Sequence, residues 1–499
     1  MHPSALAKRL YLLLFLVIIA FYLYGLGRLP LLGPDEPRYA EVAREMLVRG
    51  DLITPTLGGH TWFEKPALLY WLMIASFRIF GVHEWAARLG PALCGLLTIA
   101  AVAYVGRAVE RGLEQAAEVA RKSDGAGVSG EERNLGFWSV LVAASSLGLL
   151  VFSRGASFDV VITMTTAWAL AFFLKHELDE EKRSATLIGF YIFVGLSLLA
   201  KGLVGIVVPF GVVGLYYLLR RAWPTRQVWL SLFWGVPLAL AVSAVWYGPV
   251  IARHGWTFID EFFIEHHFAR YVSNKYHHPQ PIYFYLVIIL LLTLPWTPFF
   301  VAALTKLRTW TWRGGDALSV VRVFALAWLA LPILFFSFSG SKLPGYILPS
   351  LPAVAFLISD YLIHAKSRWL PGPTARLVIF GITFIFVAAV LIFAAPRYAR
   401  GESVRDLLQL AAARGYANAP VLAQRTDDRT AQFYAHDRVV YNADGEVITF
   451  DEVSLEQAQA LGPKLLVVIP VRHLDRFRGA PQFEIIGDNG HTALIGWTP

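Results

Sequence analysis

The sequence is poor in charged residues and has almost no cysteine. Asp, Glu, Lys and Arg make up 16% of its 499 residues, against about 25% in a typical soluble domain. Hydrophobic residues make up 56%, and the mean hydropathy is +0.52. This composition argues against an ordinary soluble enzyme and predicts a membrane protein. The single cysteine, Cys94, excludes a disulfide framework and a thiolate metal site.

What the sequence has in abundance is long apolar runs. The stretch "LYLLLFLVIIAFYLYGLG" is long enough, at 1.5 Å per residue, to cross a hydrocarbon core of about 30 Å. No A-x-A-like cleavage site follows it, so we expect a retained first span and not a cleaved signal peptide. We predict about eleven spans (ten to thirteen): 9–29, 87–108, 136–153, 159–176, 186–201, 203–220, 229–250, 282–303, 320–338, 343–362 and 374–395.

Basic residues crowd alternate loops between these spans. Lys and Arg recur in the loops after 108, 176, 220, 303 and 362, which the positive-inside rule places in the cytoplasm. This distribution is a sufficient explanation of the net charge of +8, and we expect no nucleic-acid partner. Residues 30–86, 154–158, 251–281, 339–342 and 396–499 then face outward, to the periplasm if the membrane is a bacterial inner membrane.

Two segments and the tail need separate interpretation. The stretch 66–81 is apolar but short, and we expect an interfacial helix on the outer face. Residues 109–134 have no sustained apolar run and predict a flexible cytoplasmic loop. After 395, short runs such as "APVLAQ", "DRVVYN", "KLLVVIP" and "TALIGW" predict strands, and "SVRDLLQLAAARG" and "SLEQAQALG" predict helices. The chain therefore divides into a membrane domain, 1–395, with a functional outer loop at 30–86, and a small α/β domain, 396–499.

The outer loop opens with "GPDEPRYAEVAREM", residues 33–46, which places several charges directly after the first span. Pro37 suits the first turn of a helix, and acidic residues before it complement the helix dipole. Asp35, Arg38 and Tyr39 share a helix face. Taken alone, the motif is equally compatible with an ordinary helix cap.

Other outward-facing segments bring ionisable residues to the same side. They are "WFEKP" with Glu64 and Lys65, "SRGASFDV" with Arg154 and Asp159, "LLAKGL" with Lys201, "EHHFARY" with Glu265, His266, His267 and Arg270, and "SKLPGY" with Lys342 and Tyr346. Ionisable groups at membrane depth are costly and usually mark a site. Acids beside several bases suit an anionic, phosphorylated ligand. Glu64 with His266 or His267 could hold a divalent cation, although histidines in an aqueous loop are also ordinary.

Together these motifs resemble the bacterial aminoarabinose transferases of the ArnT type, within the protein mannosyltransferase-like GT-C glycosyltransferases. The resemblance covers roughly residues 9–362 and only loosely the tail. It implies a GT-C fold, mainly α, and an inner-membrane enzyme whose active site faces the periplasm. Such enzymes move a sugar from a polyprenyl-phosphate carrier to an acceptor, which in the ArnT type is a lipid A phosphate. We expect a monomer.

The resemblance also implies roles for single residues. Asp35 is the central catalytic carboxylate, and Asp159 and Glu36 assist it. Lys65 and Arg270 bind the carrier phosphate, with Lys201, Tyr346 and Lys342 nearby, while Arg38 and Tyr39 act on the acceptor or support the site. Glu64 and His266 flank a divalent metal, zinc by resemblance.

Two alternatives stay open from the sequence. One is a transferase of the same fold that acts on another glycan or on protein hydroxyls, because the loops that read the acceptor carry no interpretable motif. The other is a lipid or sugar transporter, which would bind near the bilayer midplane and often shows internal repeats. No repeat is evident, and the charges lie at the outer boundary.

Overall fold

The computed structural model describes residues 5–124, 134–179, 181–269, 280–364, 370–423, 429–442, 445 and 447–499. The chain forms two compact units. The first, here called the bundle unit, comprises Met1–Tyr24, Glu64–Leu69 and Pro91–Ile385. The second, the sheet unit, comprises Gly25–Phe63, Tyr70–Gly90 and Phe386–Pro499.

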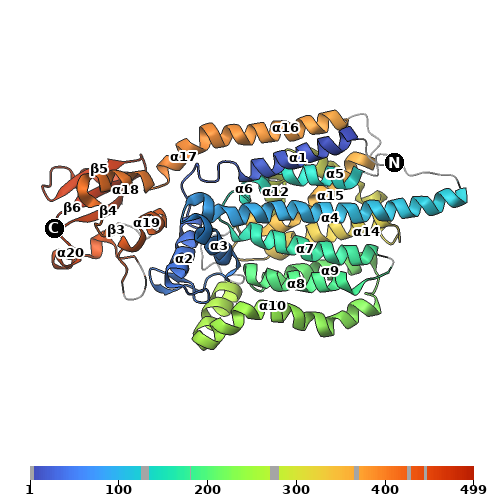
Figure 1. Cartoon of the computed structure of the whole chain (residues 1–499), viewed down its shortest axis with the longest axis horizontal. Coiled ribbons are helices and arrows are strands. Elements are labelled where there is room, and N and C mark those ends of the chain that lie inside the picture. The colour runs from blue at the N-terminus through green and yellow to red at the C-terminus, as the bar shows by residue number, and fades with distance from the viewer. Residues whose placement is uncertain are drawn as a thin grey trace. The chain divides into compact units, whose positions relative to one another are not determined.

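All eleven predicted spans are helical, and most of their helices run alongside one another in the bundle (Figure 1). The helices are α1 Ala5–Leu23, α4 Glu84–Asp124, α5 Leu135–Ser145, α6 Leu147–Phe152, α7 Phe158–Leu178, α8 Ser184–Lys201, α9 Val204–Arg220, α10 Arg226–Phe258, η2 Ile259–Ala269, α12 Phe284–Leu292, α13 Thr297–Thr305, η3 Lys306–Thr309, α14 Ala317–Ser337, η4 Pro344–Ser350, α15 Leu351–His364, α16 Pro373–Ala389, η5 Val390–Ala394 and α17 Ala395–Gly401.

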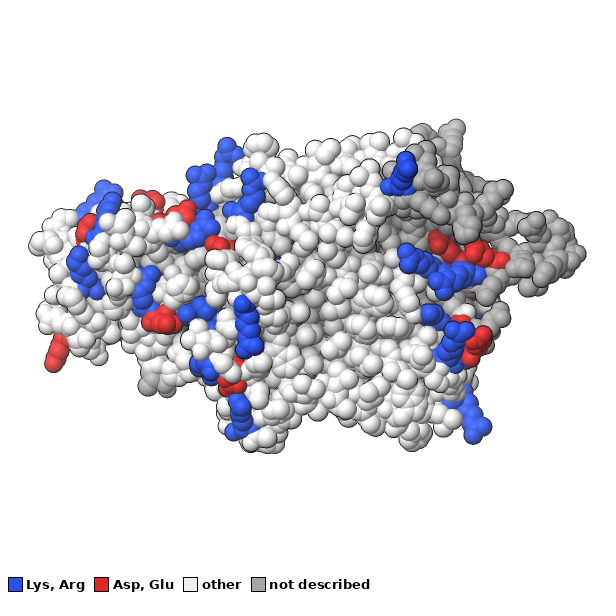
Figure 2. Space-filling view, in the orientation of Figure 1, with Lys and Arg blue, Asp and Glu red and all other residues white. Residues whose placement is uncertain are grey.

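Seven of the described helical segments are long and apolar enough to cross a membrane unaided. They are Glu84–Glu114, Phe158–Leu178, Ser184–Lys201, Arg226–His266, Ala317–Ser337, Pro344–His364 and Pro373–Gly401. On the face seen in Figure 2, the middle of the bundle carries almost no charge, and the charged side chains, Lys and Arg together with Asp and Glu, gather toward both ends. The chain is a multi-pass membrane protein, as predicted.

Two predicted spans are each broken into two helices. Ser146, between α5 and α6, has an extended backbone, and residues 293–296 separate α12 from α13. The two breaks bond to each other: the Leu147 N–H donates to the Leu294 carbonyl (2.9 Å), and the Trp296 indole donates to the Ser145 hydroxyl (2.9 Å). This pairing satisfies backbone groups that hydrocarbon could not hydrate.

The prediction of a flexible loop over 109–134 is wrong for its first part, because α4 continues to Asp124. The segment is polar but rich in Ala, Glu, Arg and Gln, which favour helix without needing an apolar run. Its last part, 125–133, lies outside the described residues. The third outer segment, 251–281, is also helical as far as Ala269: α10 has a kink at Gly255, and η2 follows directly after it.

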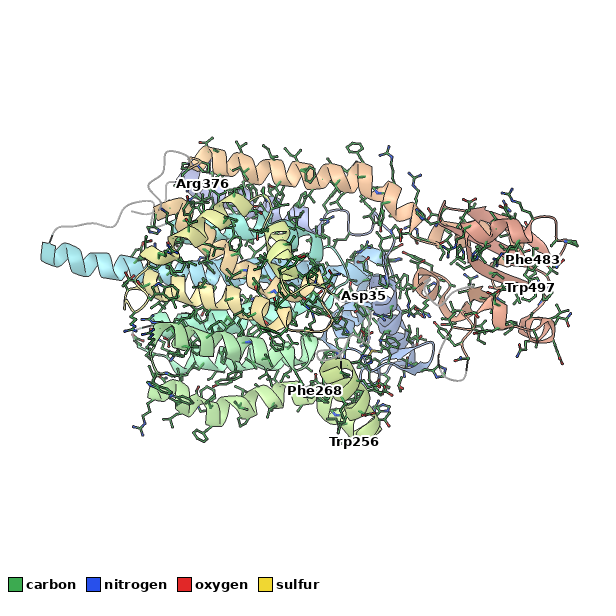
Figure 3. The ribbon with its side chains drawn as sticks, turned by 180° about the vertical axis from the view of Figure 1, so that it is seen from behind. Asp35, Trp256, Phe268, Arg376, Phe483 and Trp497 are labelled. Atoms are coloured by element: carbon green, nitrogen blue, oxygen red, sulfur yellow. The ribbon has the colours of Figure 1, made fainter. Side chains whose placement is uncertain are left out.

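The tail forms the predicted α/β domain around a sheet of order β3-β4-β6-β5. Its elements are α18 Arg405–Ala411, η6 Ala412–Tyr416, β3 Val421–Ala423, α19 Arg429–Tyr434, η7 His436–Arg438, η8 Phe450–Glu452, α20 Leu455–Leu461, β4 Leu465–Pro470, η9 Val471–Phe477, β5 Phe483–Asp488 and β6 Thr492–Trp497. "DRVVYN" makes only isolated bridges, whereas β5 was not predicted. On one face of the sheet, Phe483 stacks on Trp497 at 5.8 Å between ring centroids (Figure 3).

The outer loop is held in the sheet unit by four short elements. They are α2 Glu36–Arg49, β1 Thr56–Leu57, β2 His60–Thr61 and α3 Leu68–Phe80. α2 begins as predicted, with the buried Pro37 in its first turn, and ends at Gly50 in the left-handed conformation. The apolar segment predicted at 66–81 forms α3, a helix shorter than a span.

The backbone before α2 wraps around one buried guanidinium. Arg88, near the start of α4, donates to the carbonyls of residues 26, 29 and 30 at 2.7–2.8 Å and to both carboxylate oxygens of Glu36. The Glu36 carboxylate also accepts the Leu32 N–H at 2.9 Å. Side-chain exposure is 5% for Arg88 and 15% for Glu36. These hydrogen bonds, here called the Arg88 cluster, fix the path of the chain that leads to Asp35.

The C-terminal domain closes over the same loop. The Tyr434 hydroxyl accepts the Leu31 N–H at 2.8 Å and donates to Glu84 at 3.1 Å, and Arg405 donates to the same Glu84 oxygen. On α2, Arg44 binds both Glu41 and Asp437. Burial raises the pKa of Glu41 to about 7, although the hydrogen bonds and charge of Arg44 act in the opposite direction.

We expect the Arg88 cluster to contribute strongly to the stability of the fold. Arg88→Met leaves the Glu36 carboxylate buried without its partner, which costs about 3–5 kcal/mol when a buried pair is broken. Thermal unfolding in detergent should show a markedly lower Tm for Arg88→Met and a partial loss for Arg88→Lys. Arg78→Met, at an exposed position of α3, serves as the control and should unfold like wild type. An unchanged Tm for Arg88→Met would contradict the assignment.

Candidate active site

Two helix ends meet in the bundle unit and carry opposite charges. Asp159 lies in the first turn of α7, after the N-cap Ser157, whose hydroxyl accepts the Asp159 N–H at 3.1 Å. Lys201 is the last residue of α8. An acid at a helix N-terminus and a base at a helix C-terminus both complement the helix dipoles. The Lys201 ammonium donates to the Asp159 carboxylate, so the two predicted residues form an ion pair.

Tyr346 completes this cluster from η4. Its ring lies 4.4 Å from the Lys201 ammonium, a cation–π contact. The neighbouring Gly345 packs so closely on the carboxylate that a Cβ at this position would lie 1.9 Å from Asp159 Oδ2. Asp159, Lys201 and Tyr346 therefore lie together, and Gly345 provides the space for the Asp159 carboxylate.

Two further predicted lysines lie in the same unit with partners of their own. The Lys342 ammonium donates to the carbonyls of Ser339 (2.7 Å) and Gln280 (3.1 Å) and is largely buried. Lys65 donates to Glu64 at 2.6 Å. Lys342 thus ties two segments of the bundle together, whereas Lys65 and Glu64 form a charge pair with 14% and 8% side-chain exposure.

The other predicted carboxylate, Asp35, lies in the sheet unit at the N-cap of α2 (Figure 3). Its side chain is 50% exposed and is bound by Arg38 at 2.6 Å. The Arg38 guanidinium lies 5.2 Å from the Trp62 ring and 5.4 Å from the Tyr39 ring, measured to the centroids. Aromatic side chains therefore hold Arg38 in place, and Arg38 orients an accessible carboxylate.

The structure gives Glu36 and Tyr39 supporting positions. Both Glu36 oxygens are engaged by Arg88, and Tyr39 is buried with its ring 6.4 Å from that of Tyr70. Glu36 therefore shapes the loop that carries Asp35. Arg270 and the side chain of His267 lie outside the part of the chain that the structure describes.

The predicted metal ligands are two residues, Glu64 and His266. Glu64 is engaged by Lys65, and His266 is half-buried on η2. Within the described ranges, no three His, Cys, Asp or Glu side chains group to hold a metal. Zinc usually takes four ligands, so one carboxylate and one imidazole leave the shell incomplete.

Several supporting residues were not predicted from the sequence. They are Gly345, Glu84, Arg88, Tyr434 and Asp437. The one available signal was Arg88, a cation inside the apolar stretch predicted as a span at 87–108. The others depend on contacts between segments up to 403 residues apart, and no local pattern indicates such contacts.

Comparison with known proteins identifies the family and the fold of the chain. The family described as dolichyl-phosphate-mannose-protein mannosyltransferase matches residues 8–117 and 125–259. The undecaprenyl phosphate-alpha-4-amino-4-deoxy-L-arabinose arabinosyl transferase of Aeromonas salmonicida is 30% identical over 417 residues, which cover 79% of this chain and 68% of the relative. The protein of the same name from Pseudomonas aeruginosa is 29% identical over 70% of this chain and 59% of its own length.

Solved structures share the fold over nearly the whole chain. ArnT from Cupriavidus metallidurans bound to undecaprenyl phosphate superposes with a TM-score of 0.77, covering 97% of this chain and 98% of its own at 21% identity. Its apo state gives 0.74. The predicted GT-C fold is thereby confirmed. The chain belongs to the undecaprenyl phosphate-α-4-amino-4-deoxy-L-arabinose arabinosyl transferases, the ArnT family, and is a membrane glycosyltransferase.

Proposed function

We propose that this enzyme transfers 4-amino-4-deoxy-L-arabinose from an undecaprenyl phosphate carrier to a phosphate of lipid A. The names of its relatives support the sugar, and the undecaprenyl phosphate bound to the Cupriavidus metallidurans protein supports the carrier. The observation that carries the proposal is the Asp159–Lys201–Tyr346 cluster, which holds a cation at the end of two apolar helices. A lipid whose tail lies among the helices would bring its phosphate to that level.

The chemistry follows from the charges. The bond between the anomeric carbon and the carrier phosphate oxygen breaks, the carrier leaves as undecaprenyl phosphate, and an acceptor oxygen bonds to the anomeric carbon. Negative charge builds on the leaving phosphate, so Lys201 and Lys65 stabilise the transition state more than the ground state. In this proposal Arg270 and Lys342 add further positive charge that stabilises the leaving phosphate.

A phosphate acceptor is already anionic and needs little general-base help. Asp35 therefore acts by positioning the acceptor or by stabilising positive charge on the sugar, with Asp159 setting the position of Lys201. For a hydroxyl acceptor the same Asp35 would serve as the base. The rival hypothesis, a transferase for another glycan or a protein hydroxyl, is favoured by the mannosyltransferase family match.

The proposed orientation places the site at the periplasmic face of the bacterial inner membrane. The basic residues at the other end of the bundle helices support it. They include Lys175, Lys182, Arg183, Arg220, Arg221 and Arg226, which lie near or after the ends of α7 and α9. By the positive-inside rule, that end belongs in the cytoplasm.

The direct test is transfer by the purified enzyme. Protein in lipid nanodiscs receives the undecaprenyl-linked aminoarabinose with lipid A, a glycan or a peptide as acceptor, and mass spectrometry identifies the product. We expect modified lipid A. Lys201→Ala should lower kcat/KM roughly 10- to 100-fold, because a lost charge-assisted contact costs about 1.5–3 kcal/mol.

Lys175→Ala is the matched control. Lys175 also lies over a tyrosine ring, that of Tyr104 at 4.9 Å, but near the opposite end of α7. It should retain wild-type transfer. Product on a peptide or a glycan in place of lipid A would establish the rival hypothesis, and equal activity of both lysine variants would exclude Lys201 from the site.

Gly345→Ala tests the packing behind Asp159. The added methyl group would lie 1.9 Å from the carboxylate oxygen, so Asp159 must move and lose its alignment with Lys201. Overpacking of this kind costs about 1–3 kcal/mol, and we expect turnover to fall roughly 5- to 150-fold with little change in overall fold. Gly381→Ala, where nothing lies within 4 Å of the new Cβ, should be neutral. Wild-type turnover by Gly345→Ala would show that Asp159 need not keep this position.

Zinc at Glu64 and His266 stays a prediction. A bound divalent ion would offset the charge of the carrier phosphate. Elemental analysis of protein purified without added metal should then find zinc in wild type and less in Glu64→Gln and His266→Ala. Equally little zinc in all three, with transfer unaffected by chelator, would remove the metal from the site.

A further inference from the structure

A groove opens between α8, α9 and α10, near the end of the bundle away from Lys201. Its volume is about 600 Å³. Its deep wall is aromatic, with Phe190 on α8 and Phe210 on α9 among the lining residues, and its mouth is formed by Leu218, Arg221 and Trp223. Leu218 and Trp223 are 71% and 85% exposed, so the groove opens on the surface of the bundle.

Along α9, the residues that line the groove extend over about the thickness of one lipid leaflet. Phe210 and Arg221 are separated by eleven helical steps, about 16 Å at 1.5 Å per residue, and half of a hydrocarbon core is about 15 Å. Trp223 and Trp229 lie at the mouth with Arg221, as expected for aromatic residues at the level of lipid headgroups. An acyl chain that enters at the mouth would therefore end near Phe210.

Arg221 is the cation at this mouth, and its backbone is unusual. It caps α9 in the left-handed conformation, with φ 51° and ψ 42°, where glycine is the ordinary residue. Its neighbour Arg220 donates to the Gly314 carbonyl and the Tyr216 hydroxyl. The Arg221 guanidinium, by contrast, makes no hydrogen bond or ion pair with the part of the chain that the structure describes. Strained backbone tends to be kept at functional sites.

We propose that this groove binds an anionic phospholipid, with the phosphate on Arg221 and one acyl chain along Phe190, Phe210 and Gly214. Charge complementarity selects the headgroup, since basic pockets between membrane helices bind anionic lipids. The site is separate from the Asp159–Lys201 cluster, which lies at the other end of α7 and α8. The proposal does not depend on which sugar or acceptor the enzyme uses.

The experiment measures which lipid stays bound to the full-length protein. Protein from nanodiscs holding equal amounts of phosphatidylglycerol and phosphatidylcholine is released for native mass spectrometry. We expect one retained phosphatidylglycerol per chain, preferred at least fivefold over phosphatidylcholine.

Arg221→Gly should abolish that preference, because it removes the guanidinium. It should not lower the Tm in neutral detergent, because glycine adopts the left-handed conformation without strain. Arg221→Lys should keep most of the preference. Arg308→Ala removes another exposed cation after α13 and should change nothing. This comparison separates headgroup binding from a purely structural role for Arg221.

A second variant tests the tail. Gly214 lines the groove, and nothing lies within 4 Å of a Cβ added there. Gly214→Leu should fill the groove and reduce retention of both lipids, while Gly381→Leu, on α16 with equally open surroundings, should retain them like wild type.

Any of four results would overturn the proposal, and three of them concern phosphatidylglycerol itself. They are equal retention of the two lipids by wild type, unchanged phosphatidylglycerol retention in Arg221→Gly, and displacement of the lipid by millimolar inorganic phosphate, which would identify a site for the free ion. Preferred retention of undecaprenyl phosphate over phosphatidylglycerol would also contradict it.

Discussion

The hydrocarbon around the bundle cannot hydrate a charge or a backbone amide, and the arrangement of the bundle follows from this constraint. Asp159 and Lys201 lie at the ends of α7 and α8, where the helix dipoles favour them, and they neutralise each other. The two breaks in the bundle are paired through the Leu147–Leu294 hydrogen bond. The Lys201 ammonium is therefore held at a helix end and not within the apolar interior.

The sheet unit holds Asp35 in place at the end of a loop with little regular structure. Arg88 gathers three carbonyls and Glu36, and Tyr434 holds the Leu31 N–H. The C-terminal domain therefore braces the loop that carries the candidate carboxylate. Such a brace lowers the number of conformations available to Asp35, which is how positioning contributes to catalysis.

Most of the fold could be predicted from the sequence alone, because apolar runs mark the spans and basic loops indicate their orientation. All eleven predicted spans are helical, and three of the residues expected at the outer face, Asp159, Lys201 and Tyr346, lie together. The helical continuation of α4 beyond residue 108 was missed because its residues favour helix without being apolar. The Arg88 cluster and the contacts of Tyr434 could not be predicted, since they depend on tertiary contacts that produce no periodic pattern in the sequence.

The central claim is that the Asp159–Lys201 end of the bundle receives the carrier phosphate. A cryo-EM structure of the enzyme with undecaprenyl phosphate bound measures this most directly. The account predicts a phosphate oxygen within hydrogen-bonding distance, about 3 Å, of the Lys201 or Lys65 ammonium, with the Asp159 carboxylate still beside Lys201. A phosphate that contacts neither lysine would contradict it.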